Sequence, residues 1–242
     1  MKISSPIVRS YKSWKRNRKI LREKPELWHF ETAGFGYIQI PKVATRSIQL
    51  CLANYYVEQE KMSKSLEWRK KAIRVIEDKT AFHATQKKIF KISKNTFIFA
   101  FVRNPYERLY SAYKNKVLQP LESGAKNILI NHGVTLGVSF EEFVDIVCNI
   151  PDKSIDRHLR SQSWFLTFEG NLIPSYIGRL ESFDEDWKVL SNRFGLPAPM
   201  HKNSTKKSKN SLVLEGFSSE LQEKVYKRYE QDFLMFNYRT HL

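Results

Sequence analysis

Two short segments of this chain combine a cation and hydroxyls at a point where an apolar run passes into a predicted helix. The first is the loop Pro41–Ser47, which follows the run Phe35–Ile40. The second begins at Arg103, directly after the run Phe97–Val102, and includes Ser111 further along. Free backbone N–H groups at a helix start favour anions, and nearby cations add to that preference. Two such segments predict a ligand that carries two separate phosphate groups.

The first loop differs from the phosphate-binding loop of nucleotide triphosphatases. That loop has the pattern G-x-x-x-x-G-K-[ST], whereas residues 41–47 contain no glycine and their lysine, Lys42, comes early. A magnesium-dependent triphosphatase is therefore disfavoured. Taken alone, the loop would also fit a simple connection with Lys42 on its surface, and it is the second segment that favours phosphate binding.

Strand, turn and helix signals alternate along the chain and predict an α/β fold with three layers, in which a central parallel sheet is flanked by helices. The helix after Val102 has the clearest start signals, with Asn104 as N-cap, Pro105 at the first position and Glu107 at the capping-box position. Residues 118–138 have the composition of a surface excursion. The other expected elements are strands at 35–40 and 176–181 and helices at 13–22, 47–52, 64–77, 139–147, 183–194 and 221–236. We expect a basic N-terminal extension over residues 1–30 and a single domain over residues 31–242.

The composition is that of a globular protein, with 41% hydrophobic and 27% charged residues among 242. No apolar run is long enough to cross a bilayer, and the first residues lack the apolar core of a signal peptide. Cys51 and Cys148 each lie among apolar neighbours, which favours buried thiols over a disulfide. The six histidines are scattered, so no metal site is expected.

The net charge of +16 favours an anionic partner, which could be nucleic acid, an anionic membrane, a phosphorylated cofactor or an acidic polysaccharide. Basic residues concentrate in the N-terminal segment and again at residues 202–209. A nucleic-acid-binding protein would interleave aromatic residues with Lys and Arg on one surface, and no such motif stands out. Nucleic-acid binding and an atypical P-loop nucleotide kinase remain the alternative functions.

The pair of motifs Ile40–Ile48 and Phe101–Tyr113 resembles the sulfotransferases, most of all the carbohydrate branch that includes the HNK-1, chondroitin 4-O and uronyl 2-O enzymes. Weaker similarities follow at Ser139–Phe143, Asp156–His158, Tyr176–Glu181 and Tyr229–Phe233. The resemblance implies a metal-independent enzyme that transfers a sulfuryl group from 3′-phosphoadenosine 5′-phosphosulfate (PAPS) to a hydroxyl of a glycan or glycoconjugate. The expected product is adenosine 3′,5′-bisphosphate.

The resemblance also assigns roles to the residues that bind PAPS. Arg103 and Ser111 would hold the 3′-phosphate, with Arg179 and Lys202 as further candidates. Arg46 departs from the family pattern, because it stands where family loops usually have a small or hydroxyl residue. The residues that would hold the 5′-phosphosulfate are Lys42, Val43, Ala44, Thr45, Arg46, Ser47 and Ile48.

The same comparison suggests the residues that carry out the transfer. Lys42 would neutralise the leaving oxygen, and His83, which lies between the two phosphate motifs, would be the general base. For an arbitrary histidine, a structural role would be the better interpretation, so His83 depends on its position in the resemblance. His158 is the second candidate, and with Arg160 it is expected to bind the acceptor. We expect a cytoplasmic enzyme whose basic N-terminus would suit peripheral contact with an anionic membrane.

Overall fold

The structure is a computed structural model, and it describes residues 23–59, 78–199 and 217–241. The helices expected at 13–22 and 64–77 and the basic residues from Lys202 lie outside these ranges. The chain divides into two compact units, and the single domain expected over residues 31–242 stays a prediction. Of the described residues, 24–59, 78–104 and 165–199 form the sheet unit, and 23, 105–164 and 217–241 form the helical unit.

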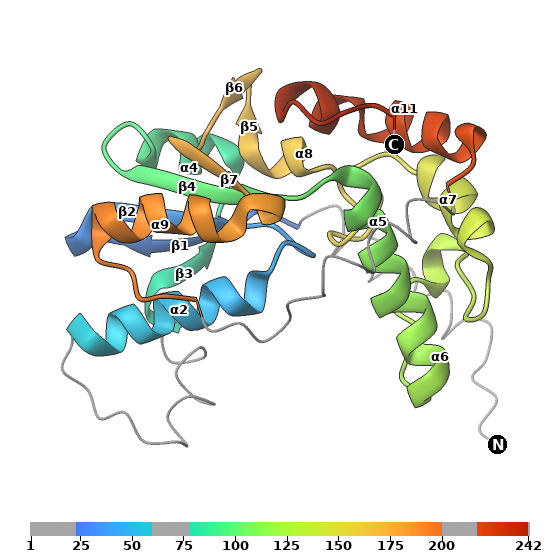
Figure 1. Cartoon of the computed structure of the whole chain (residues 1–242), viewed down its shortest axis with the longest axis horizontal. Coiled ribbons are helices and arrows are strands. Elements are labelled where there is room, and N and C mark those ends of the chain that lie inside the picture. The colour runs from blue at the N-terminus through green and yellow to red at the C-terminus, as the bar shows by residue number, and fades with distance from the viewer. Residues whose placement is uncertain (1–22, 60–77, 200–216, 242) are drawn as a thin grey trace. The chain divides into compact units, whose positions relative to one another are not determined.

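The sheet unit contains a five-stranded sheet in the order β3-β1-β2-β4-β7 (Figure 1). Strand β1 pairs in antiparallel fashion with both β2 and β3, whereas β2, β4 and β7 pair in parallel. Strands β2, β3, β4 and β7 therefore all run in one direction, and the expected parallel sheet is correct except for β1. The strands are β1 (Glu26–Phe30), β2 (Phe35–Gln39), β3 (Ala81–His83), β4 (Phe97–Val102) and β7 (Tyr176–Arg179).

Strand β1 corrects the predicted N-terminal extension. Residues 26–30 were assigned to that extension, but they form a central strand in which Leu27 and Trp28 are completely buried. The register joins Glu26 to Gln39 on one side and to His83 on the other. The sheet therefore begins before residue 31.

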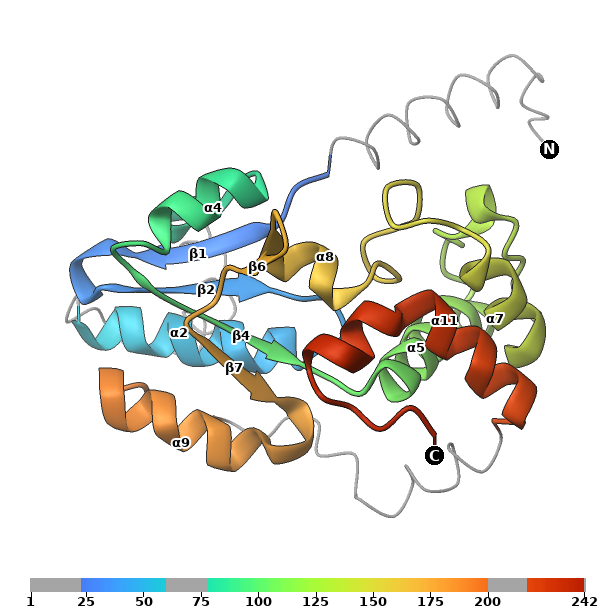
Figure 2. The same ribbon diagram turned by 90° about the horizontal axis from the view of Figure 1, so that it is seen from above.

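Alternate side chains of the sheet pack against two helices on one of its faces. The ring of Phe35 lies 5.6 Å from Tyr55 of α2 (Thr45–Gln59) and 4.9 Å from Phe194 of α9 (Phe183–Phe194). Figure 2 shows α4 (Gln86–Ile92) on the opposite face. The three-layer α/β class is thus confirmed. Short elements complete the unit: η1 (Glu31–Ala33), η4 (Leu180–Ser182) and the hairpin of β5 (Thr167–Phe168) and β6 (Asn171–Leu172).

Gly178 allows β4 and β7 to pack closely. A Cβ atom at this position would lie 2.5 Å from Cε1 of Phe101, well inside van der Waals contact. Only a residue without a side chain leaves room for that ring beside β7.

The helical unit is built around a long helix that follows β4. Helix α5 (Pro105–Tyr113) continues through a π-helical turn, η2 (Lys114–Leu118), into α6 (Gln119–Ser123). Pro105 is the first helical residue, as predicted. The other elements are η3 (Ile130–His132), α7 (Phe140–Cys148), α8 (Gln162–Leu166), whose last two residues belong to the sheet unit, and α11 (Ser219–Met235).

Two sequence predictions in this unit can be compared with the structure. The capped start of α7 is confirmed: Ser139 Oγ accepts from the N–H of Glu142 at 3.1 Å, and the Glu142 carboxylate accepts from the N–H of Ser139 at 2.8 Å. The surface excursion at 118–138 is wrong in part, because Leu129 and Val134 are completely buried in the core of the unit.

Candidate functional site

The predicted site residues of the sheet unit gather at one edge of the sheet. Because β2, β3, β4 and β7 run in one direction, their carboxyl ends meet at the same edge. The loop Pro41–Ser47 follows β2, His83 ends β3, Arg103 follows β4 and Arg179 ends β7. Ligands of open α/β sheets bind outside the carboxyl ends of their strands. We call these residues the strand-end site.

The loop after β2 has an unusual backbone. Lys42 and Ala44 adopt positive φ angles of 72° and 43°, a conformation that costs free energy for any residue with a side chain. Alternation between left- and right-handed backbone turns successive N–H groups toward a common point, which forms an anion-binding nest. Strain of this kind is found at functional sites. The sequence does not predict these positive φ angles, because the loop lacks glycine, the residue that usually adopts them.

The side chains of this loop divide into buried and accessible groups. Val43 and Ile48 are completely buried, and the N–H groups of Ser47 and Ile48 both donate to the carbonyl oxygen of Ala44, at 2.9 and 3.1 Å, so of these residues Val43 could reach a ligand only through its backbone. Thr45 donates its hydroxyl hydrogen to the carbonyl oxygen of Ile40 at 2.9 Å, which leaves the Thr45 hydroxyl only as an acceptor. Its predicted part in holding phosphate therefore falls to its N–H group. Arg46 is exposed, and Lys42 is half-buried.

Arg103 and Arg179 lie at neighbouring strand ends. The register pairs Val102 with Arg179, so Arg103 comes one residue beyond that pair. Asp186 accepts the N–H of Arg179 at 2.8 Å, and Glu181 accepts the N–H of Asn104 at 2.6 Å. Carboxylates on the β7 side thus hold the backbone beside both arginines. The side chains of Arg103 and Arg179 are half-buried.

His83 lies at the carboxyl end of β3 and is exposed. Its register partner is Glu26, which pairs in turn with Gln39 at the end of β2. His83 is thus two strands away from the loop that contains Lys42, which corresponds to about 10 Å between backbones. The three paired residues share a face of the sheet.

The remaining predicted residues belong to the helical unit. Ser111 lies on α5 and is half-buried. His158 has a partner that composition alone does not reveal: its Nδ1 atom lies 2.6 Å from Oδ1 of Asp156. Arg160 was expected to bind the acceptor with His158, and that role stays a prediction; in the structure its side chain is buried, only 1% exposed. Its Nε atom donates to the carbonyl oxygen of Ile155 at 3.1 Å, and its guanidinium stacks on Trp164.

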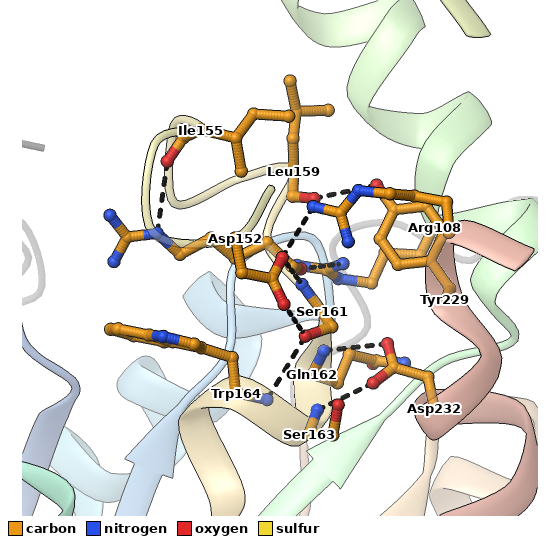
Figure 3. Close-up of polar contacts among 12 residues, drawn as sticks. Arg108, Asp152, Ile155, Leu159, Ser161, Gln162, Ser163, Trp164, Tyr229 and Asp232 are labelled. Atoms are coloured by element: carbon orange, nitrogen blue, oxygen red, sulfur yellow. Dashed lines mark hydrogen bonds and ion pairs between the residues drawn. The ribbon is translucent and has the colours of Figure 1, made fainter. Parts of the chain in front are cut away.

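A buried polar network holds the backbone of residues 159–163, which directly follows His158 and includes Arg160 (Figure 3). Arg108 of α5 donates to the carbonyl oxygen of Arg160 at 2.7 Å, and the Tyr229 hydroxyl donates to that of Leu159 at 2.8 Å. Asp232, which is completely buried, accepts the N–H groups of Gln162 and Ser163 at 2.8 and 2.7 Å. Two separate helices, α5 and α11, therefore fix the backbone of residues 159–160 and the first two residues of α8.

A second set of contacts extends the network at Asp152. Its carboxylate accepts the Ser161 N–H at 2.9 Å, the Ser161 hydroxyl, and a guanidinium hydrogen of Arg228 at 2.6 Å. Sequence reasoning missed Asp152, Arg108 and Asp232. A carboxylate such as Asp232, set between Gln231 and Phe233 on an amphipathic helix, resembles a solvated residue, and no local pattern reveals its partners 70 residues away.

The strand-end site defines the class of protein: an α/β protein whose parallel strand ends carry cations and a loop with two positive φ angles. The chain matches the sulfotransferase family over residues 25–239, and it therefore belongs to that family.

The chain is also similar to several curated carbohydrate sulfotransferases. It is 29% identical to carbohydrate sulfotransferase 11 of Rattus norvegicus over 174 residues, which cover 60% of this chain and 47% of the relative. Identity is 26% with carbohydrate sulfotransferase 9 of Homo sapiens, over 60% of this chain and 38% of the relative. Identity is 27% with carbohydrate sulfotransferase 12 of Xenopus laevis, over 64% of this chain and 42% of the relative. The chain spans about half the length of the relatives it matches or less, and no solved structure gives a significant match.

Proposed function

We propose that this protein transfers a sulfuryl group from PAPS to a hydroxyl of a glycan or glycoconjugate, with a histidine as general base. The observation that carries the proposal is the strand-end site, where a strained loop with Lys42, the exposed His83 and Arg103 lie at one edge of the sheet of a sulfotransferase-family chain. The names of the relatives, all carbohydrate sulfotransferases, favour a glycan as the acceptor.

The residues present fit a donor with two phosphate groups. The nest around Lys42 and Ala44 suits the 5′-phosphate, because its N–H groups and the start of α2 would point at one anion. Arg103 offers a planar fork of donors to the 3′-phosphate, and Ser111 is a second donor in this proposal. Arg179, at the neighbouring strand end, adds a further positive charge.

PAPS would supply the activated sulfuryl group, whose bond to the 5′-phosphate oxygen breaks as the bond to the acceptor oxygen forms. Lys42 would stabilise the negative charge that develops on the leaving oxygen. His83 would take the proton from the acceptor hydroxyl, which makes that oxygen nucleophilic. The backbone of residues 43–46 would hold the reacting groups in line, because the N–H groups of Ser47 and Ile48 already donate to the carbonyl oxygen of Ala44.

Binding of adenosine 3′,5′-bisphosphate tests the donor site without any acceptor. We expect millimolar ligand to raise the melting temperature in the presence of EDTA, because a ligand that binds only the folded state stabilises it by mass action. Arg103→Ala should weaken binding by a factor of about 10² to 10³, the effect of losing a charged partner of a phosphate. Lys188→Ala, which removes an exposed lysine of α9, is the matched control and should bind normally. A wild-type protein whose melting temperature does not respond would refute the proposal.

Transfer itself is measured with labelled PAPS and a panel of acceptors that includes unsulfated chondroitin, a neutral oligosaccharide and a simple alcohol. Incorporation of label into a glycan supports the proposal. Lys42→Ala should lower kcat much more than it weakens adenosine 3′,5′-bisphosphate binding, since its contact strengthens in the transition state. Label in none of the glycans would refute a carbohydrate acceptor.

The two alternative functions make different predictions in the same assays. A nucleotide kinase would turn over ATP with Mg²⁺, and a nucleic-acid-binding protein would bind oligonucleotides without competition from adenosine 3′,5′-bisphosphate. Within the described residues, no helix is long and apolar enough to cross a membrane. The cytoplasmic location and the peripheral membrane contact stay predictions, which cell fractionation would test.

A further inference from the structure

The helical unit contains a histidine whose ring is held by a carboxylate. Nδ1 of His158 lies 2.6 Å from Oδ1 of Asp156, and the backbone N–H of His158 donates to the same oxygen at 3.0 Å. The His158 side chain remains 28% exposed, whereas that of Asp156 is 16% exposed. The pair is therefore partly accessible, with its histidine the more exposed member.

The contact fixes which nitrogen of the ring can accept a hydrogen bond. Burial alone would raise the pKa of Asp156, but the hydrogen bonds and charge of His158 outweigh it and lower that pKa to about 2. The carboxylate is thus ionised at neutral pH and can only accept, so Nδ1 must carry the hydrogen. In a neutral ring the other nitrogen, Nε2, is then an acceptor. Within the described ranges, the hydrogen bonds of the ring involve Nδ1, which leaves Nε2 for a ligand.

The surroundings keep the ring neutral near pH 7. Burial lowers the pKa of His158 below its ordinary value, and the positive charges of Lys116 and Arg157 lower it further. Asp156 raises the pKa but does not cancel the decrease. Lys116 comes from the π-helical turn η2, and Arg157 precedes His158 in the chain. A neutral imidazole with its acceptor nitrogen available is suited to a hydroxyl donor rather than to an anion.

The buried network holds the backbone on the C-terminal side of this pair. Tyr229 holds the carbonyl oxygen of Leu159, the residue after His158, and Arg108 holds the carbonyl oxygen of the next residue, Arg160. Asp232 then holds the two N–H groups that follow Ser161 (Figure 3). Such support fixes the orientation of a side chain before a ligand arrives, which reduces the entropic cost of binding.

We infer that Nε2 of His158 accepts a hydrogen bond from a hydroxyl of the glycan acceptor, and that Asp156 is the positioning residue that sets the tautomer of the ring. The inference rests on the proposed function, because it assumes a glycan acceptor. It assigns His158 to recognition of the acceptor, separately from the proton transfer proposed for His83.

The tautomer is tested first, on the protein without any ligand. Nitrogen-15 NMR of the imidazole should show hydrogen on Nδ1 in the wild type at pH 7.5, and Asp156→Asn should change the tautomer populations. A wild-type ring with hydrogen on Nε2 would overturn the inference, since that nitrogen could then only donate.

Steady-state kinetics with the best glycan of the panel, unsulfated chondroitin being the first tried, tests recognition. His158→Ala should raise the KM for the glycan about 10-fold, as for the loss of one hydrogen bond, and should leave kcat and adenosine 3′,5′-bisphosphate binding within about twofold. The wild-type KM should rise as the pH falls below the pKa of His158, because a protonated Nε2 cannot accept. Asp156→Asn should weaken this pH dependence. His241→Ala, which removes an exposed histidine, is the control and should change none of these values.

The outcomes separate this inference from the proposed function. If the wild type neither binds adenosine 3′,5′-bisphosphate nor sulfates a glycan, the proposed function is wrong, and the inference falls with it. If the wild type sulfates a glycan but His158→Ala keeps its KM, only the inference is wrong. If His158→Ala loses kcat instead, and with it the rise of the rate with increasing pH, His158 is the base and the assignment of His83 is wrong.

Discussion

Asp232 offers the sharpest test of the buried network. Its side chain is completely buried and accepts two backbone N–H groups, at 2.8 and 2.7 Å. Asp232→Asn keeps the volume of the side chain, so no cavity forms. The oxygen of the asparagine amide can accept one of the two N–H groups. The NH₂ group then faces the other N–H, and two donors cannot form a hydrogen bond. A buried donor without its acceptor costs about 1–3 kcal/mol.

The substitution also removes a negative charge near the buried guanidinium of Arg108, whose pKa is lowered by burial and raised by Asp232 among other groups. Breaking a buried charge pair adds to the cost of the lost acceptor. We therefore expect Asp232→Asn to lower the free energy of unfolding by about 2–4 kcal/mol. Burial also raises the pKa of Asp232 itself, which means that the buried charge has a desolvation cost. The substitution removes that cost, so about 4 kcal/mol is an upper limit for the loss of stability.

Urea unfolding measures this free energy, and hydrogen exchange of the peptide 161–166 reports on the two N–H groups directly. The matched control is Glu230→Gln, an exposed carboxylate on the same helix, which should change stability by less than about 0.5 kcal/mol. Unchanged protection of the Gln162 and Ser163 amides in Asp232→Asn would refute the reasoning. So would a loss of stability no larger than that of the control.

Three further predictions follow from the same structure. His83→Ala should lower the rate of sulfation by about 10² to 10⁴ while adenosine 3′,5′-bisphosphate still binds; a variant with most of its activity would exclude His83 as the base. Gly178→Ala should destabilise the protein by about 1–3 kcal/mol in thermal unfolding, because its Cβ would lie 2.5 Å from the Phe101 ring, and an unchanged melting temperature would contradict this packing. The pKa of Asp156 is lowered from 3.8 to about 2 in the folded state, so its contribution is present above pH 4 and is lost as the pH falls toward 2. This loss amounts to about 2 kcal/mol, and Asp156→Asn should lack it in unfolding measurements across that range.

The sequence by itself determined the elements whose signals are local. Pro105 begins α5, Ser139 and Glu142 cap α7 reciprocally, and Gly195 ends α9 with a φ of 68°. Each signal acts within about one turn of helix, so a short window of sequence contains both the residue and its partner. The apolar run Phe97–Val102 likewise predicted a buried strand, and its order with the helices around it was enough to predict the α/β class.

Local signals failed where the partner is distant. Residues 26–30 continue a basic segment and were predicted to belong to an extension before the first core strand. Pairing with β2 and β3 makes Glu26–Phe30 an internal strand of the sheet. Arg160 was predicted to bind the acceptor from its place beside His158 in a stretch that resembles the family, and no local signal indicates its burial. In the fold its guanidinium is buried against Trp164 and near Glu23, 3.6 Å away.

The tertiary structure alone decided how the candidate site is assembled. The loop with Lys42, His83 and Arg103 are each recognisable along the chain, but only the common direction of β2, β3 and β4 brings them to one edge of the sheet. The same holds for the network around Asp232, which bonds residues 70 positions away. A hydrogen bond or a strand pair depends on positions in space, and the free energy that selects one pairing over its alternatives comes from burial of the whole core. The sequence pattern can therefore identify candidate residues, whereas the fold determines which of them lie close together in space.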